Sequence, residues 1–257
     1  MDLFQAIILA SIQGIAEWLP ISSSAHLAAA QMLMNVQPPI IFDIMLHVGT
    51  LIAAIAYFRK DISNMLLALA KFDRKNGDFK LAILIIVASI PTAIIGFAFK
   101  DFFESQFSNL PAIGVAMLIT GAFLYVCERK TGNKSVGNKN SLFMGIAQGI
   151  AVMPGISRSG ATIGAGLLMG ISRESATRFS FLLSIPAIFG AAFFEWVTAK
   201  GADVIELQLL VIPALVSMVV GYFSIAFMMK FVRERGLKPF AYYCFAFGLL
   251  AIIPSIF

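Results

Sequence analysis

The sequence predicts an all-α polytopic membrane protein, a single integral membrane domain over residues 1–257 that is built as an inverted-topology repeat. Three observations predict this fold: an apolar composition, a polar motif that occurs twice, and basic residues that gather in alternate loops. Apolar residues make up 59% of the chain, charged residues only 13%, and the mean hydropathy is +0.88. A soluble core needs no such apolar excess, so the helices are expected to lie in a lipid bilayer.

Six apolar segments are long enough to be transmembrane helices, since a spanning helix needs roughly 20 residues. They cover residues 40–58, 81–99, 111–127, 179–197, 207–229 and 240–257. The two cysteines, Cys127 and Cys244, stand alone near the ends of predicted helices. This isolation indicates packing residues and not a metal site or a disulfide.

Two polar segments interrupt the apolar sequence and are imperfect copies of one another. They read QGIAEWLPISSSAH at 13–26 and QGIAVMPGISRSGAT at 148–162. Each predicts a half-helix, a break at proline, a serine cluster and a second half-helix. Breaks at membrane depth expose backbone polar groups that lipid cannot satisfy, so they persist only where protein or a water-filled cavity surrounds them. The function is therefore expected where the two breaks meet.

The basic residues follow a topological pattern. All but three of the 19 Lys and Arg fall in loops at 59–80, 128–140, 173–178 and 230–238, and the exceptions are Lys100, Arg158 and Lys200. If these four loops are cytoplasmic, the positive-inside rule is obeyed throughout. The net charge of +5 then reflects membrane topology, and no nucleic-acid partner is expected.

This topology determines how the two polar segments enter the bilayer. Residues 1–35 must begin and end outside, and residues 141–171 must begin and end inside. They are therefore predicted to form two re-entrant helix-loop-helix hairpins that enter from opposite faces, each followed by three transmembrane helices. Repeat 1 covers about residues 1–127 and repeat 2 about residues 141–257, the plan of many transporters with sites near the midplane.

The first break is preceded by a carboxylate. Gln13 and Glu17 are four residues apart, so on a helix they share a face and can hold one ion or water between them. A carboxylate within an apolar stretch is costly, and it therefore indicates a functional site. Pairing with Arg158 is the structural alternative for Glu17.

Hydroxyl groups and an imidazole follow this break. Ser22, Ser23 and Ser24 begin the next half-helix, where one serine suffices as a helix cap and the others are free for a substrate. His26 lies one turn further and is expected to exchange a proton with Ser22 or Ser23. His47 is interpreted as an interfacial hydrogen-bonding residue.

The second break combines glycines, hydroxyl groups and one guanidinium group. Glycine permits a positive φ and a close approach of the backbone to a ligand, and the N-terminus of the following helix favours an anion. Arg158 adds a fork that suits phosphate oxygens. The accompanying residues are Gly155, Ser157, Ser159, Gly160 and Thr162. A carboxylate on one hairpin and this cradle on the other indicate metal-assisted phosphoryl chemistry.

Taken together, the two motifs resemble those of the undecaprenyl pyrophosphate phosphatase family, the bacitracin-resistance family. The resemblance covers essentially the whole chain, including FDIMLHVGT at 42–50. It implies a multi-pass enzyme of the bacterial inner (plasma) membrane that removes the terminal phosphate of undecaprenyl pyrophosphate at the outer, periplasmic face and so recycles the lipid carrier of peptidoglycan synthesis. The implied partners are the polyprenyl pyrophosphate lipid and the bilayer, and a homo-oligomer is compatible with the sequence.

The resemblance also implies roles for individual residues. It makes Glu17 the essential acid, Ser23 a nucleophile, His26 an acid/base or nucleophile, and Arg158 the centre of the pyrophosphate cradle. The substrate-binding residues of both breaks are then Ser22, Ser24, Gly155, Ser157, Ser159, Gly160 and Thr162. A divalent cation, Mg²⁺ or Ca²⁺, is expected at Glu17 and Gln13. Because Gln13 stands where the family's motif has its first acid, Glu17 carries more of the metal-binding role.

Two alternatives stay open at this point. Serine, histidine and water can all attack phosphorus, so the nucleophile is undetermined. A transporter or lipid flippase is the competing functional class, because inverted repeats with broken helices and a central anion site are transporter architecture. Release of phosphate by detergent-solubilised protein, where no second compartment exists, discriminates between enzyme and transporter.

Overall fold

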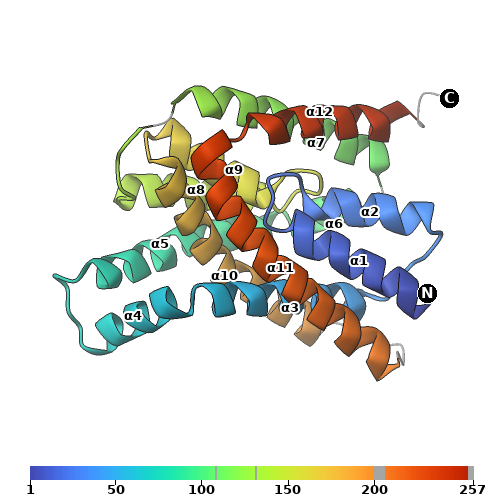
Figure 1. Ribbon diagram of the computed structural model, residues 1–257, viewed down its shortest axis with the longest axis horizontal. Coiled ribbons are helices and arrows are strands. Elements are labelled where there is room, and N and C mark those ends of the chain that lie inside the picture. The colour runs from blue at the N-terminus through green and yellow to red at the C-terminus, as the bar shows by residue number, and fades with distance from the viewer. Residues whose placement is uncertain (108, 131, 199–205, 254–257) are drawn as a thin grey trace.

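The computed structural model describes residues 1–257 except 108, 131, 199–205 and 254–257, and the described part is helical (Figure 1). The helices are α1 Leu3–Ala16, α2 Ser23–Leu33, α3 Ile40–Tyr57, α4 Arg59–Ala70, α5 Gly77–Ala98, α6 Lys100–Ser105, α7 Leu110–Cys127, the 3₁₀ helix η1 Glu128–Lys130, α8 Asn138–Ile150, α9 Arg158–Leu168, α10 Arg173–Thr198, α11 Leu207–Arg235 and α12 Lys238–Ile252. No strand occurs among the residues described.

In the described part of the chain, five helices are long and apolar enough to cross a membrane: α3, α5, α7 with η1, α10 and α11. Their outer faces carry large apolar side chains such as Ile90, Phe189 and Phe223, which are 54%, 62% and 67% exposed. A soluble protein rarely exposes so many contiguous apolar groups, whereas lipid solvates them. The predicted all-α polytopic membrane protein is confirmed.

The sixth predicted span, 240–257, corresponds to α12. Its described part has 15 residues, about 22 Å of helix, and residues 254–257 of the prediction lie outside the described residues. α12 lies along α7, and two glycines allow the close contact (Figure 1). A Cβ atom added at Gly248 would stand 2.8 Å from the carbonyl oxygen of Gly114, so a larger residue there would push the two helices apart.

Each polar motif forms a helical hairpin, α1 with α2 and α8 with α9. The ends of the second hairpin are joined by Lys134, whose backbone N–H donates to Gly170 at 3.0 Å. In Figure 1 the first hairpin opens to the right, beside the N-terminus, while the segment that leads into α8 lies on the left. This arrangement is compatible with an inverted repeat, and both the repeat topology and the orientation of the hairpins in a bilayer stay predictions.

The first helix of each hairpin packs on a long helix of the other half, α1 on α11 and α8 on α5. Corresponding glycines permit both contacts. A Cβ atom at Gly14 would lie 2.8 Å from the Cβ atom of Val220, and one at Gly149 would lie 2.8 Å from the Cβ atom of Ile95. The two copies of the motif are therefore held by matching contacts.

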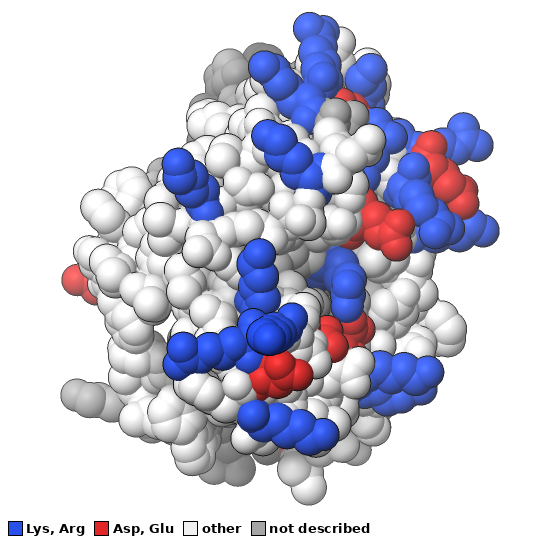
Figure 2. Space-filling model, turned by 90° about the vertical axis from the view of Figure 1, so that its left-hand side faces the viewer, with Lys and Arg blue, Asp and Glu red and all other residues white. Residues whose placement is uncertain are grey.

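Lys and Arg gather on the face that forms the left-hand side of Figure 1 (Figure 2). The loop predicted at 59–80 on this face is largely helical, because it contains α4 and the first residues of α5. Met65 and Ala68 of α4 are buried, and the Asn76 side chain caps α5 by accepting from the Asp78 backbone N–H at 2.8 Å. The short helix α6 was likewise not predicted.

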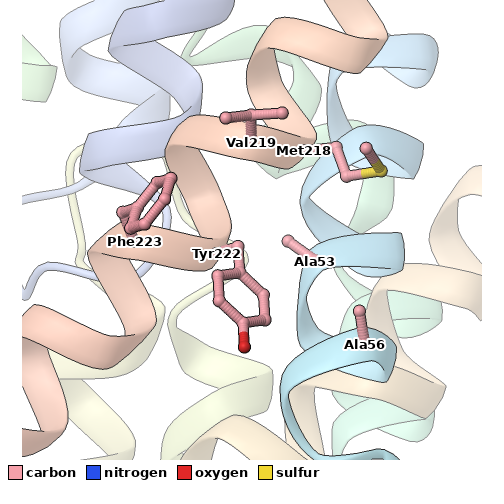
Figure 3. Close-up of a pocket in the computed structure, with 6 residues that line it drawn as sticks. All are labelled: Ala53, Ala56, Met218, Val219, Tyr222 and Phe223. Atoms are coloured by element: carbon pink, nitrogen blue, oxygen red, sulfur yellow. The ribbon is translucent and has the colours of Figure 1, made fainter.

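A groove runs along the outside of the α3–α11 contact. Figure 3 shows Tyr222 of α11 pointing toward Ala53 and Ala56 of α3. Val219 and Phe223 of α11 also line the groove. A second hollow further along the same two helices is lined by apolar residues throughout. Neither hollow includes an acidic, basic or histidine side chain, so the polar motifs form a separate site in the interior.

Candidate active site

The breaks of the two hairpins meet inside the helical bundle. The Ser159 hydroxyl group of the second break donates to the Leu19 carbonyl oxygen of the first at 3.0 Å. The Gly155 backbone N–H, also of the second break, donates to the Ser24 hydroxyl oxygen of the first at 3.3 Å. The prediction that the two motifs come together is confirmed.

Glu17, which follows α1, lies at the centre of this junction and is only 8% exposed. Its Oε1 atom accepts from the Arg158 Nη2 atom in a buried ion pair across the two hairpins. Its Oε2 atom accepts from the Gln13 amide at 3.0 Å and from the Ser23 hydroxyl group at 2.7 Å. The structure thus brings three of the predicted site residues, Arg158, Gln13 and Ser23, around the carboxylate of a fourth, Glu17.

Arg158 has one further donor that is available to a ligand. Its Nη2 atom is used by Glu17, whereas its Nη1 atom is buried and finds no acceptor among the described residues. The guanidinium carbon lies 5.4 Å from the centre of the Trp18 ring, which limits the directions in which the side chain can turn. A buried donor without a partner is costly, so Nη1 is poised to bind an anionic oxygen.

The first break differs from the predicted helix cap. Ser22 occupies the N-cap position of α2 with φ of 66°, and its side chain makes no capping hydrogen bond. Its hydroxyl oxygen lies 3.1 Å from that of Ser24. In the second break Ser157 does cap, because its hydroxyl oxygen accepts from the Gly160 backbone N–H at 3.1 Å. The capping alternative therefore describes the second motif and not the first.

The glycines of the second break serve protein packing in this structure. Gly155 has φ of 88°, and a Cβ atom there would lie 2.7 Å from the Cβ atom of Ala116 on α7. The Thr120 hydroxyl group, also on α7, donates to the Gly155 carbonyl oxygen and accepts from the Ser157 backbone N–H, both at 3.3 Å. A Cβ atom at Gly160 would lie 3.3 Å from the side chain of Leu124, which is also on α7. α7 thus fixes the shape of the predicted cradle.

The hydroxyl groups of the predicted cradle are buried and bonded to protein groups. Ser157 and Ser159 have hydroxyl oxygens 3.2 Å apart. Thr162 bonds to the Arg158 carbonyl oxygen and to Ser180 of α10. Within this motif Arg158 contacts Glu17, whereas the hydroxyl groups of Ser157, Ser159 and Thr162 stabilise the turn through hydrogen bonds to other protein groups.

His26 is placed differently from the expectation. It was expected to reach a serine hydroxyl group, yet its Nδ1 atom lies 2.8 Å from the backbone carbonyl oxygen of Ser22, and its Nε2 atom lies 2.7 Å from the hydroxyl oxygen of Tyr243 on α12. The spacing of residues along α2 could not reveal the contact with Tyr243, because Tyr243 is 217 residues away in sequence.

Two residues near Glu17 were missed by the sequence reasoning. His47 does bond within its own helix, through Nδ1 to the Asp43 carbonyl oxygen at 2.8 Å, but its Nε2 atom lies 3.9 Å from Glu17 Oε2. Trp18 is fully buried beneath Arg158. An ionisable side chain within the apolar span 40–58 was the signal available for His47.

The residues present can hold a divalent cation only with help from a substrate. In the part of the chain that the structure describes, no three His, Cys, Asp or Glu side chains converge on one point. The Gln13 Oε1 atom, however, is buried next to Glu17 without a donor. Mg²⁺ is commonly bound by one or two protein oxygen groups together with phosphate oxygens and water, so this donor set fits such an ion once a pyrophosphate is bound.

Comparison with known proteins gives consistent matches over the whole chain. A family model described as bacitracin resistance protein BacA matches residues 6–250. A protein from Desulforapulum autotrophicum named undecaprenyl-diphosphatase is 40% identical, over 98% of this chain and 98% of its own. Proteins of the same name from Methanosphaera stadtmanae and Syntrophotalea carbinolica are 40% and 42% identical, over 100% and 96% of this chain and 99% and 97% of theirs.

Proposed function

The chain belongs to the BacA bacitracin resistance family, and on this premise we propose that it is an undecaprenyl-diphosphatase. The reaction removes the terminal phosphate of undecaprenyl pyrophosphate and yields undecaprenyl phosphate and inorganic phosphate. The observation that carries the assignment of the site is the Glu17–Arg158 pair with one unpartnered Arg158 donor. An anionic oxygen can bind Nη1 while Nη2 keeps its contact with Glu17, so substrate binding does not require a buried charge to lose its partner.

The attacking group is assigned to Ser23. Its hydroxyl group already donates to Glu17 at 2.7 Å, so the carboxylate can accept the proton as the oxygen attacks the terminal phosphorus. The bond from phosphorus to the bridging oxygen breaks, and undecaprenyl phosphate leaves with that oxygen. Water then attacks the phosphoserine, Glu17 returns the proton to Ser23, and inorganic phosphate is released.

A phosphoenzyme trap tests this assignment against the alternatives. Labelled substrate should leave an acid-stable adduct on the wild-type protein, and Ser23→Ala should abolish both the adduct and phosphate release. An acid-labile adduct lost in His26→Gln would assign the attack to His26. Wild-type turnover with no adduct, retained in Ser23→Ala, would assign it to water.

A divalent cation, Mg²⁺ or Ca²⁺, belongs to the proposal as a cofactor that Glu17 and Gln13 would hold. When bound, such an ion would offset the negative charge of the pyrophosphate. The buried Gln13 Oε1 atom without a donor supports this part of the proposal.

We further propose that the protein lies in the plasma membrane with its active site open to the outer face. The five apolar helices and the gathering of Lys and Arg on one face support a multi-pass protein of this orientation (Figure 2). The first hairpin carries Glu17 and Ser23, and in this orientation it enters from outside.

Phosphate release from undecaprenyl pyrophosphate by detergent-solubilised protein is the direct test. Wild-type protein should release one phosphate per substrate, and Glu17→Gln, prepared in parallel, should not. Detergent leaves no second compartment, so turnover excludes a pure transporter. If wild-type protein binds the lipid and moves it between the leaflets of a vesicle but releases no phosphate, the chain is a flippase and the proposal is wrong.

A further inference from the structure

The two ring nitrogens of His26 are both engaged, on opposite sides of the imidazole. Nδ1 faces the Ser22 carbonyl oxygen at 2.8 Å, and Nε2 faces the Tyr243 hydroxyl oxygen at 2.7 Å. A carbonyl oxygen can only accept, so Nδ1 carries the ring proton and donates it. In the neutral ring Nε2 is then the acceptor, and the Tyr243 hydroxyl group donates to it. The imidazole therefore links α12 to the first break.

Ser22, at the Nδ1 end of this link, has an unusual backbone. Its φ of 66° lies in a region that residues with a side chain rarely adopt. Its side chain makes no cap, but its carbonyl oxygen receives the backbone N–H of His26 at 3.4 Å and the Nδ1–H group at 2.8 Å. A strained conformation persists only when its surroundings hold it, and His26 supplies part of that support.

The residue that follows this turn is Ser23, whose hydroxyl group lies 2.7 Å from Glu17 Oε2. The turn at Ser22 determines the direction in which α2 leaves the break, and with it the position of the Ser23 oxygen. A displacement of about 1 Å at a reacting group costs on the order of 10²-fold in rate. Support of the Ser22 turn is therefore support of the catalytic geometry.

Tyr243 sets the orientation of the imidazole from a distant part of the chain. Its ring stacks on His26 with centroids 5.5 Å apart and an angle of 12°, and Phe247 stacks on the same imidazole at 4.3 Å. The rings hold the plane of the imidazole, while the Tyr243 hydroxyl group selects the tautomer. We propose that Tyr243 is a positioning residue that acts through His26 and the Ser22 turn to place Ser23 on Glu17. This inference rests on the proposed function, in which Ser23 and Glu17 do the chemistry.

Two substitutions of His26 separate positioning from chemistry. An asparagine amide N–H takes about the place of Nδ1–H and can still donate to Ser22, whereas a glutamine amide reaches about the place of Nε2 and loses that contact. Neither amide transfers a proton to substrate at neutral pH. Positioning predicts that kcat of His26→Asn exceeds that of His26→Gln by about tenfold, the cost of one or two hydrogen bonds. Equal inactivity of both variants would overturn the inference.

Tyr243→Phe removes one hydroxyl group and keeps the stacked ring. We expect kcat to fall about three- to tenfold with KM changed less than about twofold, because only the placement of a reacting group is altered. Tyr242→Phe on the same helix is the matched control and should change neither constant. In the His26→Asn background Tyr243→Phe should have no further effect, since the residue acts through the imidazole. Independent, additive effects would contradict the proposal.

Nitrogen NMR of the histidine rings provides a readout that does not depend on turnover. The chain has two histidines, so His47 serves as an internal reference. In ¹⁵N-histidine-labelled wild-type protein, His26 should be protonated at Nδ1 with a hydrogen-bonded Nε2. Tyr243→Phe should shift the Nε2 resonance of His26 and leave His47 unchanged. Unchanged His26 resonances would overturn the inference even if the wild-type protein hydrolyses the lipid, and the expected shift would support the contact even if it does not.

Discussion

Replacing Arg158 by lysine keeps the positive charge but removes the two fixed nitrogen donors of the guanidinium group. The guanidinium group now uses one nitrogen for Glu17 and leaves the other buried without an acceptor. A lysine ammonium can pair with Glu17, but it has no second nitrogen held rigidly toward the substrate, and it loses the stack over Trp18. One lost charge-assisted hydrogen bond to phosphate is worth about 1.5–3 kcal/mol. At about 1.4 kcal/mol for each factor of ten, kcat/KM should fall about ten- to hundredfold.

The assay is phosphate release from undecaprenyl pyrophosphate in detergent, with the melting temperature measured on the same samples. Arg178→Lys is the matched control, because Arg178 also pairs with a carboxylate, that of Asp61, but on the basic face of the protein. The control should keep both activity and stability, and Arg158→Lys should lose far more activity than stability. If Arg158→Lys released phosphate at nearly the wild-type rate, Arg158 would be only the counter-ion of Glu17, and the cradle assignment would be refuted.

Three further predictions concern the cation, the basic face and the topology. Glu17→Gln should abolish cation-dependent turnover because it removes the only carboxylate of the motif. Gln13→Glu should retain turnover and tighten the apparent affinity for Mg²⁺ in a titration. Metal-stimulated activity in Glu17→Gln would contradict the prediction. Glu128 is buried and accepts hydrogen bonds from Arg173 and from the Leu237 backbone N–H, so it stabilises the basic face. Glu128→Ala should therefore lower the free energy of unfolding, measured by denaturation in detergent, by about 2–4 kcal/mol. The turnover of the folded protein should not change. Cysteines introduced at Asn76 and Gly137 should resist an impermeant thiol reagent added outside intact cells, and strong labelling at either position would rule out the predicted orientation.

Much of the architecture could be predicted because it follows from local composition. Each of the five long apolar helices and each of the two proline breaks is determined by consecutive residues. The pairing of Glu17 with Arg158, predicted as the structural alternative to a functional role, is present in the structure, since two costly charges in apolar surroundings need one another. The helices α4 and α6 were missed, because their polar residues are typical of loops as well as of amphipathic helices at a membrane surface.

The contacts that the two histidines make with other helices could not be predicted, because they depend on how helices cross. Sequence spacing places His26 one turn from the serines, but the rotamer turns its ring toward the Ser22 carbonyl oxygen and Tyr243. His47 belongs to α3, and only the packing of α3 beside α1 brings it to 3.9 Å from Glu17. Residues on different helices form one site only through tertiary packing. The residue pattern within a single helix does not show which residues of another helix lie beside it.

The two copies of the motif explain why the chain has one site and not two. Aligned at QGIA, the sequence Leu-Pro-Ile-Ser-Ser at 19–23 of the first copy matches Pro-Gly-Ile-Ser-Arg at 154–158 of the second, so Ser23 and Arg158 occupy corresponding positions just after the break. Both contact the same Glu17 carboxylate, one at each oxygen. The second copy has Val152 where the first has Glu17, and so cannot repeat the arrangement. The shared backbone plan brings the two breaks together, and in the proposed mechanism the divergence of these few side chains gives one hairpin the nucleophile and acid and the other the anion-binding group.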